Sequence, residues 1–71
     1  MRTYTVPIEH EEIVQRATQL LGDYDYGVTH VVAEHWHRGF PGVITLDVYN
    51  DEHPKLVLIE LLLSDVIIDV V

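Results

Sequence analysis

The sequence contains no cysteine, and this absence removes two common supports of a small chain. Disulfide bonds and zinc sites built on thiolates are both excluded. The 71 residues are expected to form a single domain, residues 1–71, and a domain of this size buries only about 60% of its unfolded surface. Oligomerisation is another common support. Because 48% of the residues are hydrophobic, we expect apolar surface to be buried between copies, in a dimer or a larger assembly.

Basic residues are scarce, with four lysines and arginines against 12 acids and a formal net charge of −8. A chain with few basic residues is poorly suited to the phosphate backbone of nucleic acids. It is equally unsuited to anionic membrane surfaces. The composition therefore predicts no nucleic-acid or membrane partner, whereas a basic protein partner or a metal cation is compatible with it.

An uninterrupted apolar run long enough to cross a membrane is also missing. The most hydrophobic stretch is 55–71, but Glu60, Asp65 and Asp69 interrupt it. A span needs about 20 apolar residues, and each acid at the bilayer centre costs about 2.5 to 3.5 kcal/mol. The first residues lack the apolar segment of a signal peptide. We therefore expect a cytoplasmic protein whose core forms around 55–71.

Two interpretations of 55–71 are possible. In the first, a helix with several leucines starts near Pro54 and ends at Ser64, and a β-branched strand follows over 66–71. Leucine favours helices, and valine and isoleucine favour strands. In the second, two strands meet at Ser64, because the apolar residues of 56–63 point all round a helical wheel. The first interpretation is preferred.

The remaining elements follow from hydrophobic periodicity. Alternation over 2–6 predicts a half-buried strand, and the 3.6-residue period over 8–21 predicts an amphipathic helix. Strands are expected over 28–37 and 43–49, joined by a turn of glycines and proline at 38–42. The expected core-facing helix residues are Ile13, Val14, Ala17, Leu20 and Leu21, and those of the last strand are Ile44, Leu46 and Val48.

The predicted order is β-α-β-β-α-β, which indicates an α+β fold. Its expected form is a ferredoxin-like antiparallel sheet with two helices on one face. If 55–63 is a strand, the order becomes β-α-β-β-β-β, with one helix on a curled antiparallel sheet. The β-α-β-β-α-β architecture serves many functions, so it identifies none by itself.

One local pattern indicates a metal site. His35 and His37 lie two residues apart on a predicted strand, so both side chains point to the same face. If His37 pairs with Val43 across the turn, His35 faces Thr45 and Asp47 lies diagonally on the same face. Two histidines and a carboxylate are suitable ligands for zinc or another divalent metal. The alternative is a pair of exposed or interface histidines without a metal, and no cofactor is then needed.

A second pattern indicates a protein-binding loop. Acids and tyrosines alternate between two glycines at 22–27, and loops on a rigid scaffold often bind partners. A plain connector whose tyrosines pack on the core is the alternative. The candidate partner-binding residues are Asp23, Tyr24, Asp25, Tyr26 and Trp36, the last lying between the two histidines on the opposite strand face.

Groups suited to catalysis are few. The only serine is Ser64, and a general base such as His35 needs a substrate pocket that so short a chain has little volume to form. We therefore expect a small acidic, non-catalytic module that binds protein, or regulates one, as a homo-oligomer. An inhibitor, immunity protein or antitoxin acting on a basic partner is one form of this hypothesis. The alternative is a sensor of a small ligand or divalent metal, with its site at the dimer interface.

Overall fold

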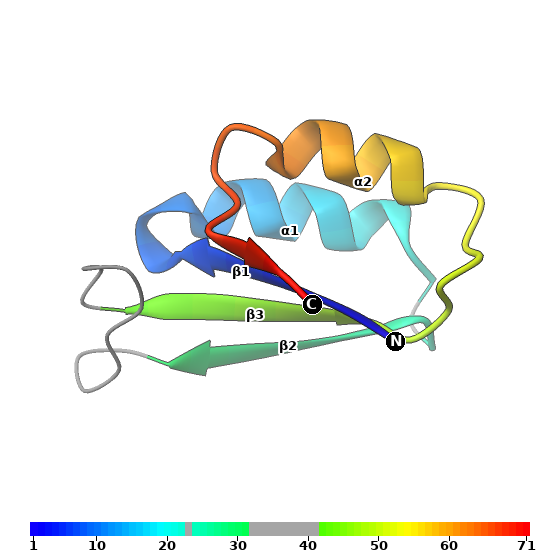
Figure 1. Ribbon diagram of the computed structural model, residues 1–71, viewed down its shortest axis with the longest axis horizontal. Helices are drawn as coiled ribbons and strands as arrows, with labels where there is room; N and C mark the ends of the chain where they lie inside the picture. The colour runs from blue at the N-terminus through cyan, green and yellow to red at the C-terminus, as the bar shows by residue number, and fades with distance from the viewer. Residues whose placement is uncertain (23, 32–41) are drawn as a thin grey trace.

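The computed structural model describes residues 1–22, 24–31 and 42–71, which form an α+β fold (Figure 1). Its elements in chain order are β1 (Arg2–Pro7), the short 3-10 helix η1 (Ile8–His10), α1 (Glu11–Leu20), β2 (Tyr26–Val31), β3 (Val43–Val48), α2 (Leu56–Leu63) and β4 (Asp69–Val70). The amphipathic helix predicted over 8–21 is therefore present, with its first turn wound as η1.

The four strands form one sheet in the order β2-β3-β1-β4, and every neighbouring pair is antiparallel. The central strand β1 pairs along its whole length with β3, from Arg2 opposite Val48 to Pro7 opposite Val43. Both helices lie side by side on one face of this sheet (Figure 1). The sheet and the two helices thus form two layers.

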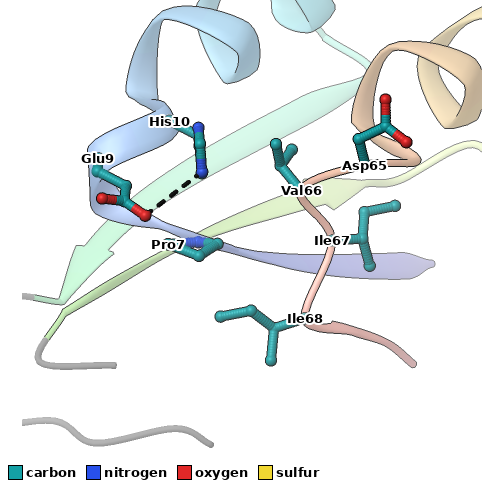
Figure 2. A pocket seen from close by; sticks show the side chains of 7 residues that line it. All are labelled: Pro7, Glu9, His10, Asp65, Val66, Ile67 and Ile68. Atoms are coloured by element: carbon teal, nitrogen blue, oxygen red, sulfur yellow. Dashed lines mark ion pairs between the residues drawn. The ribbon is translucent and has the colours of Figure 1, made fainter. Parts of the chain in front are cut away.

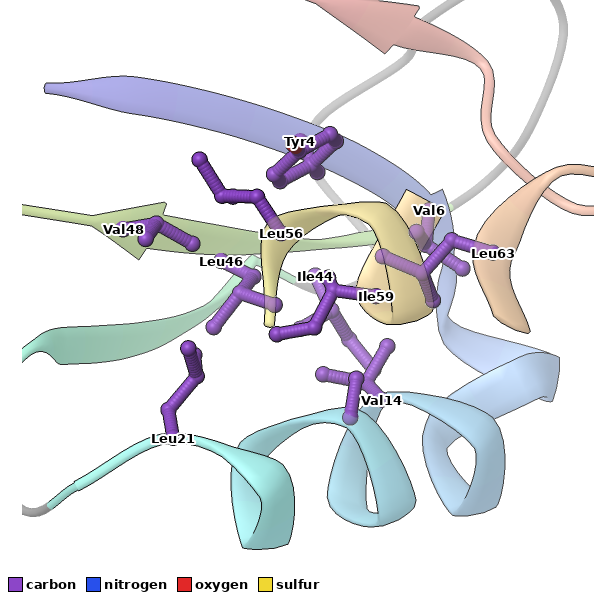
Figure 3. Packing of buried hydrophobic residues seen from close by; sticks show 11 residues of the cluster. Tyr4, Val6, Val14, Leu21, Ile44, Leu46, Val48, Leu56, Ile59 and Leu63 are labelled. Carbon is purple, nitrogen blue, oxygen red and sulfur yellow. The ribbon is translucent and has the colours of Figure 1, made fainter. Parts of the chain in front are cut away.

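The core lies between these two layers (Figure 3). Alternate residues of β1 and β3 point at the helices, as the period of two requires, and this confirms the predicted inward face of β3. The buried core residues are Tyr4, Val6, Val14, Ala17, Leu21, Ile44, Leu46, Val48, Leu56, Ile59 and Leu63. Burial of each large aliphatic side chain contributes about 1.5 to 3 kcal/mol, so this cluster accounts for the cohesion of the two layers.

Residues 55–71 form a helix followed by a strand, so the arrangement with one helix and five strands is wrong. The helix begins at Leu56, slightly later than expected, because His53 holds a turn before it: its Nδ1 accepts the N–H of Lys55 at 3.0 Å and its carbonyl accepts the N–H of Leu56 at 3.1 Å. The strand is shorter than the predicted 66–71. The N–H of Val66 donates to Leu63 at 2.9 Å, so this stretch first turns back toward β1. No helix in the described ranges is long and apolar enough to cross a membrane.

The pairing of β2 with β3 differs from the expected hairpin. Val43 lies opposite Val31, so the supposed pairing of Val43 with His37 is wrong. The two registers differ by an even number of residues, and for that reason the strand faces are unchanged. The strand β2 also begins earlier than predicted, at Tyr26. The predicted turn at 38–42 lies mostly outside the described residues.

Candidate interaction surface on helix α2

Helix α2 is aliphatic on two opposite faces. Its inner face comprises Leu56, Ile59 and Leu63, which are 8%, 0% and 0% exposed. Its outer face comprises Val57, Leu58, Leu61 and Leu62, which are 69%, 49%, 67% and 37% exposed. At about 100° per residue, the outer four fall within an arc of about 140° opposite the inner three. These four residues are called the α2 outer face.

The α2 outer face is unusual because its apolar residues are contiguous. Single exposed hydrophobic side chains are normal on a soluble protein. Four neighbouring aliphatic side chains instead form one contiguous apolar patch, and the largest such patch on a protein often has a function. Among the helix residues Leu56–Leu63, no charged side chain falls within the arc that these four residues cover. The face is therefore suited to another apolar protein surface.

A group of three hydrogen-bonded side chains, called the latch, holds α2 against the sheet. It comprises Arg2, Tyr4 and Glu60. Glu60 Oε1 accepts two hydrogen bonds, from the Tyr4 hydroxyl at 2.8 Å and from Arg2 at 2.6 Å. Burial, together with the bond to Glu60, raises the pKa of Tyr4 above its usual value. Hydrogen bonds to Tyr4 and Glu60 likewise raise the pKa of Arg2. The latch joins α2 to β1, so the α2 outer face is presented in a fixed orientation.

The two ends of α2 carry charges opposed to the helix dipole. Lys55 is the N-cap residue, and Asp65 follows the C-cap residue Ser64. The first turn holds no acid and the last turn no base. A cation is disfavoured at the positive N-terminal end of a helix, and an anion at the negative C-terminal end. Both side chains are exposed, and neither makes an ion pair within residues 1–22, 24–31 and 42–71.

The predicted partner-binding residues that the structure describes are Tyr24, Asp25 and Tyr26. Tyr24 is 94% exposed, whereas Tyr26 belongs to β2 and packs against the core. The Asp25 carboxylate lies 3.4 Å from Nε2 of His53. Asp23 and Trp36 lie outside the described residues. Within the described part of the chain, only Tyr24 therefore projects from this loop as the binding hypothesis requires.

Sequence reasoning missed the pair formed by Asp25 and His53. The His53 side chain is only 9% exposed, and its Nδ1 accepts the N–H of Lys55 at 3.0 Å. Its Nε2 therefore carries the proton that faces the carboxylate. With both nitrogens engaged, the imidazole ties the loop before β2 to the start of α2. No short-range pattern signals this pair, because its two residues are far apart in the sequence.

The predicted metal ligands fall partly outside the described residues. His35 and His37 are among those not described, and the observed register places Thr29 rather than His35 opposite Thr45. Asp47 accepts a hydrogen bond from the Thr3 hydroxyl at 2.8 Å. In the described ranges, no three histidine or acidic side chains are placed to hold a metal ion. The zinc site stays a prediction.

A hollow of about 290 Å³ lies between η1 and the segment that follows α2 (Figure 2). Its lining residues are Pro7, Glu9, His10, Asp65, Val66, Ile67 and Ile68. Glu9 and His10 face each other there at 3.4 Å, as Figure 2 shows. The other acid of the lining, Asp65, lies just beyond the C-terminal end of α2.

Comparisons with protein-family models, with curated proteins and with solved structures found no match. Function is therefore inferred from the residues of this chain. Among its described features, the α2 outer face differs most from an ordinary polar surface, because its exposed side chains are all aliphatic.

Proposed function

We propose that this protein is a small acidic, non-catalytic module that binds protein and acts as a homodimer through the α2 outer face. The observation that carries the proposal is the contiguous exposure of Val57, Leu58, Leu61 and Leu62 on a helix that is already fully packed on its other side. Burial of these side chains would remove apolar surface from water, which drives most protein association.

A second copy is the occupant that best fits this face. A foreign basic protein would need several acids at the contact, and within Leu56–Leu63 none lies in the aliphatic arc. A uniform aliphatic face is complementary to itself, so it suits an isologous interface about a two-fold axis. Four side chains of one short helix cover less than the roughly 800 Å² per partner of a standard interface. We therefore expect the surrounding polar surface to complete the contact and the affinity to be moderate.

Outside this face, the charge of the chain favours a basic protein as the regulated partner. Each copy carries a formal net charge of −8, and dimerisation doubles it. Complementary charge steers association and sets specificity. We propose a regulatory or inhibitory role in the cytoplasm.

We further assign the fold to the ferredoxin-like class. The order β-α-β-β-α-β, with both helices on one face, supports this assignment. The antiparallel strand order β2-β3-β1-β4, in which β1 and β3 are central, supports it as well.

Sedimentation equilibrium over a range of about 1 to 100 μM tests the homodimer, because this range covers moderate affinities. The wild type should dimerise, and Leu61→Ser should weaken the dimer at least about tenfold, since each copy loses part of a buried leucine. Gln19→Ser on the exposed side of α1 is the matched control and should have no effect. A wild type that is monomeric throughout, or a dimer insensitive to Leu61→Ser, would overturn the proposal. Circular dichroism checks that each variant is folded.

A further inference from the structure

We infer that the two α2 helices pack antiparallel, so that Lys55 of each copy lies beside the partner's Asp65. This inference rests on the proposed homodimer and specifies its geometry. Its basis is the match between the α2 outer face and the charges at the two ends of the same helix.

The spacing of the aliphatic residues fits an antiparallel pair. If the two-fold axis passes between Leu58 and Leu61, Leu58 meets the partner's Leu61. Val57 then meets the partner's Leu62. All four residues of the α2 outer face therefore find an aliphatic partner, and none is left over. Beyond them, the next contact brings Lys55 to the segment formed by Ser64 and Asp65 of the partner.

The charges distinguish this arrangement from a parallel one. Lys55 and Asp65 are about 15 Å apart along one helix, at 1.5 Å per residue. In a parallel pair, each lysine would lie beside the partner's lysine and each aspartate beside the partner's aspartate. In the antiparallel pair, each lies beside an opposite charge and beside the end of the partner helix whose dipole favours it. The two charges that α2 holds unfavourably in the monomer therefore become favourable in the dimer.

Three other charged or ionisable groups near α2 already have contacts of their own. Glu60 lies on the flank of the helix that faces β1, where it accepts hydrogen bonds from Arg2 and Tyr4. Glu9 and His10, across the hollow from Asp65, face each other. Lys55 contributes only its backbone N–H to the contact with His53, so its ammonium is free to reach a partner.

Reversal of the two charges tests the inference, with sedimentation equilibrium at fixed ionic strength as the measurement. Lys55→Asp and Asp65→Lys should each weaken the dimer about tenfold, because each turns two attractive contacts into two repulsive ones. The double variant K55D/D65K should recover most of the lost affinity, because the opposite charges pair again, although each then lies at the partner helix end whose dipole disfavours it. Mixing the two single variants should also recover that affinity, since the mixed dimer again pairs opposite charges.

The direction of each effect excludes a simple change in net charge. Lys55→Asp makes the chain more negative and Asp65→Lys makes it less negative, so general repulsion would move the two affinities in opposite directions. Both changes also improve the charge at an end of α2, so each monomer should melt at an equal or higher temperature than the wild type. Without rescue in the double variant, the antiparallel register is wrong even if Leu61→Ser abolishes the dimer. Loss of dimerisation in the wild type itself would instead overturn the proposed function.

Discussion

Helices α1 and α2 cover the same face of one sheet and bury similar aliphatic faces, but their outer faces differ completely. The exposed or partly exposed polar residues of α1 include Glu12, Gln15, Arg16 and Gln19. The corresponding positions of α2 are the four aliphatic residues of the α2 outer face. Water is a suitable neighbour for α1, whereas α2 exposes apolar surface that only another protein surface would cover. The comparison separates a helix whose outer face is polar from one whose outer face is aliphatic.

The charges at the ends of the two helices also differ: those of α1 suit the helix dipole and those of α2 oppose it. Glu11 and Glu12 occupy the first turn of α1, where the positive end of the dipole favours acids. Lys55 and Asp65 place the opposite signs at the ends of α2. Local electrostatics therefore support α1, while α2 depends on its packing and on the latch through Glu60.

The largest expected difference is between two single substitutions on α2, one on its inner face and one on its outer face. Leu63 is fully buried, so Leu63→Ala should lower the free energy of unfolding by about 2 to 5 kcal/mol. Leu61 is 67% exposed, so Leu61→Ala should change it by less than about 0.5 kcal/mol in the monomer. Urea unfolding below the dimerisation range measures both values. Equal costs would show that the outer face is covered even in the monomer.

The next contrast compares an acid on α2 with an acid on α1. Glu60→Ala leaves the buried Tyr4 hydroxyl without its acceptor and should cost about 1 to 2 kcal/mol of unfolding free energy. Glu12→Ala on the exposed side of α1 is the control, with an expected change below about 0.5 kcal/mol. Combining Glu60→Ala with Tyr4→Phe should recover part of the loss, because no unpaired hydroxyl remains. A cost for Glu12→Ala as large as that for Glu60→Ala would contradict the role of the latch.

The smallest effect concerns alkaline pH. The pKa of Tyr4 is raised above 10.0 in the folded protein, so the folded state keeps a proton that the unfolded state releases. Its contribution to stability is complete below about pH 10 and is lost as the pH rises through the folded pKa. The urea midpoint of the wild type should therefore fall more between pH 9 and pH 11 than that of Tyr4→Phe. Equal falls would show that Tyr4 does not titrate differently in the two states.

The sequence predicted most of the architecture because periodicity reports which residues face a core. The helix at α1 and the inward face of β3 followed directly from the 3.6- and 2-residue periods. The helix at α2 was predicted from its leucine content, but the sequence did not indicate which of its residues face the core. Its residues are aliphatic all round, so no stripe distinguished Leu61 from Leu63.

The errors have physical reasons as well. The register between β2 and β3 was wrong because an even shift keeps every side chain on its face, so Val31 and His37 are equivalent partners for Val43 in the pattern. The latch and the pair formed by Asp25 and His53 join residues far apart in the sequence. The α2 outer face was foreseen only as leftover apolar surface, because which of the leucines stay exposed depends on how the helix docks.

The central position of β1 has a consequence for folding kinetics. Strand β1 is synthesised first, but it pairs only with β3 and β4, both of which come later in the chain than β2. Until residues 43–48 emerge during synthesis, the apolar side chains of Tyr4 and Val6 have no neighbouring strand to pack beside. Pairings between distant segments are slow to form because the intervening loop must first close. The pairings of β1 with β3 and β4, rather than the more local β2–β3 pairing, are therefore expected to limit the rate of folding.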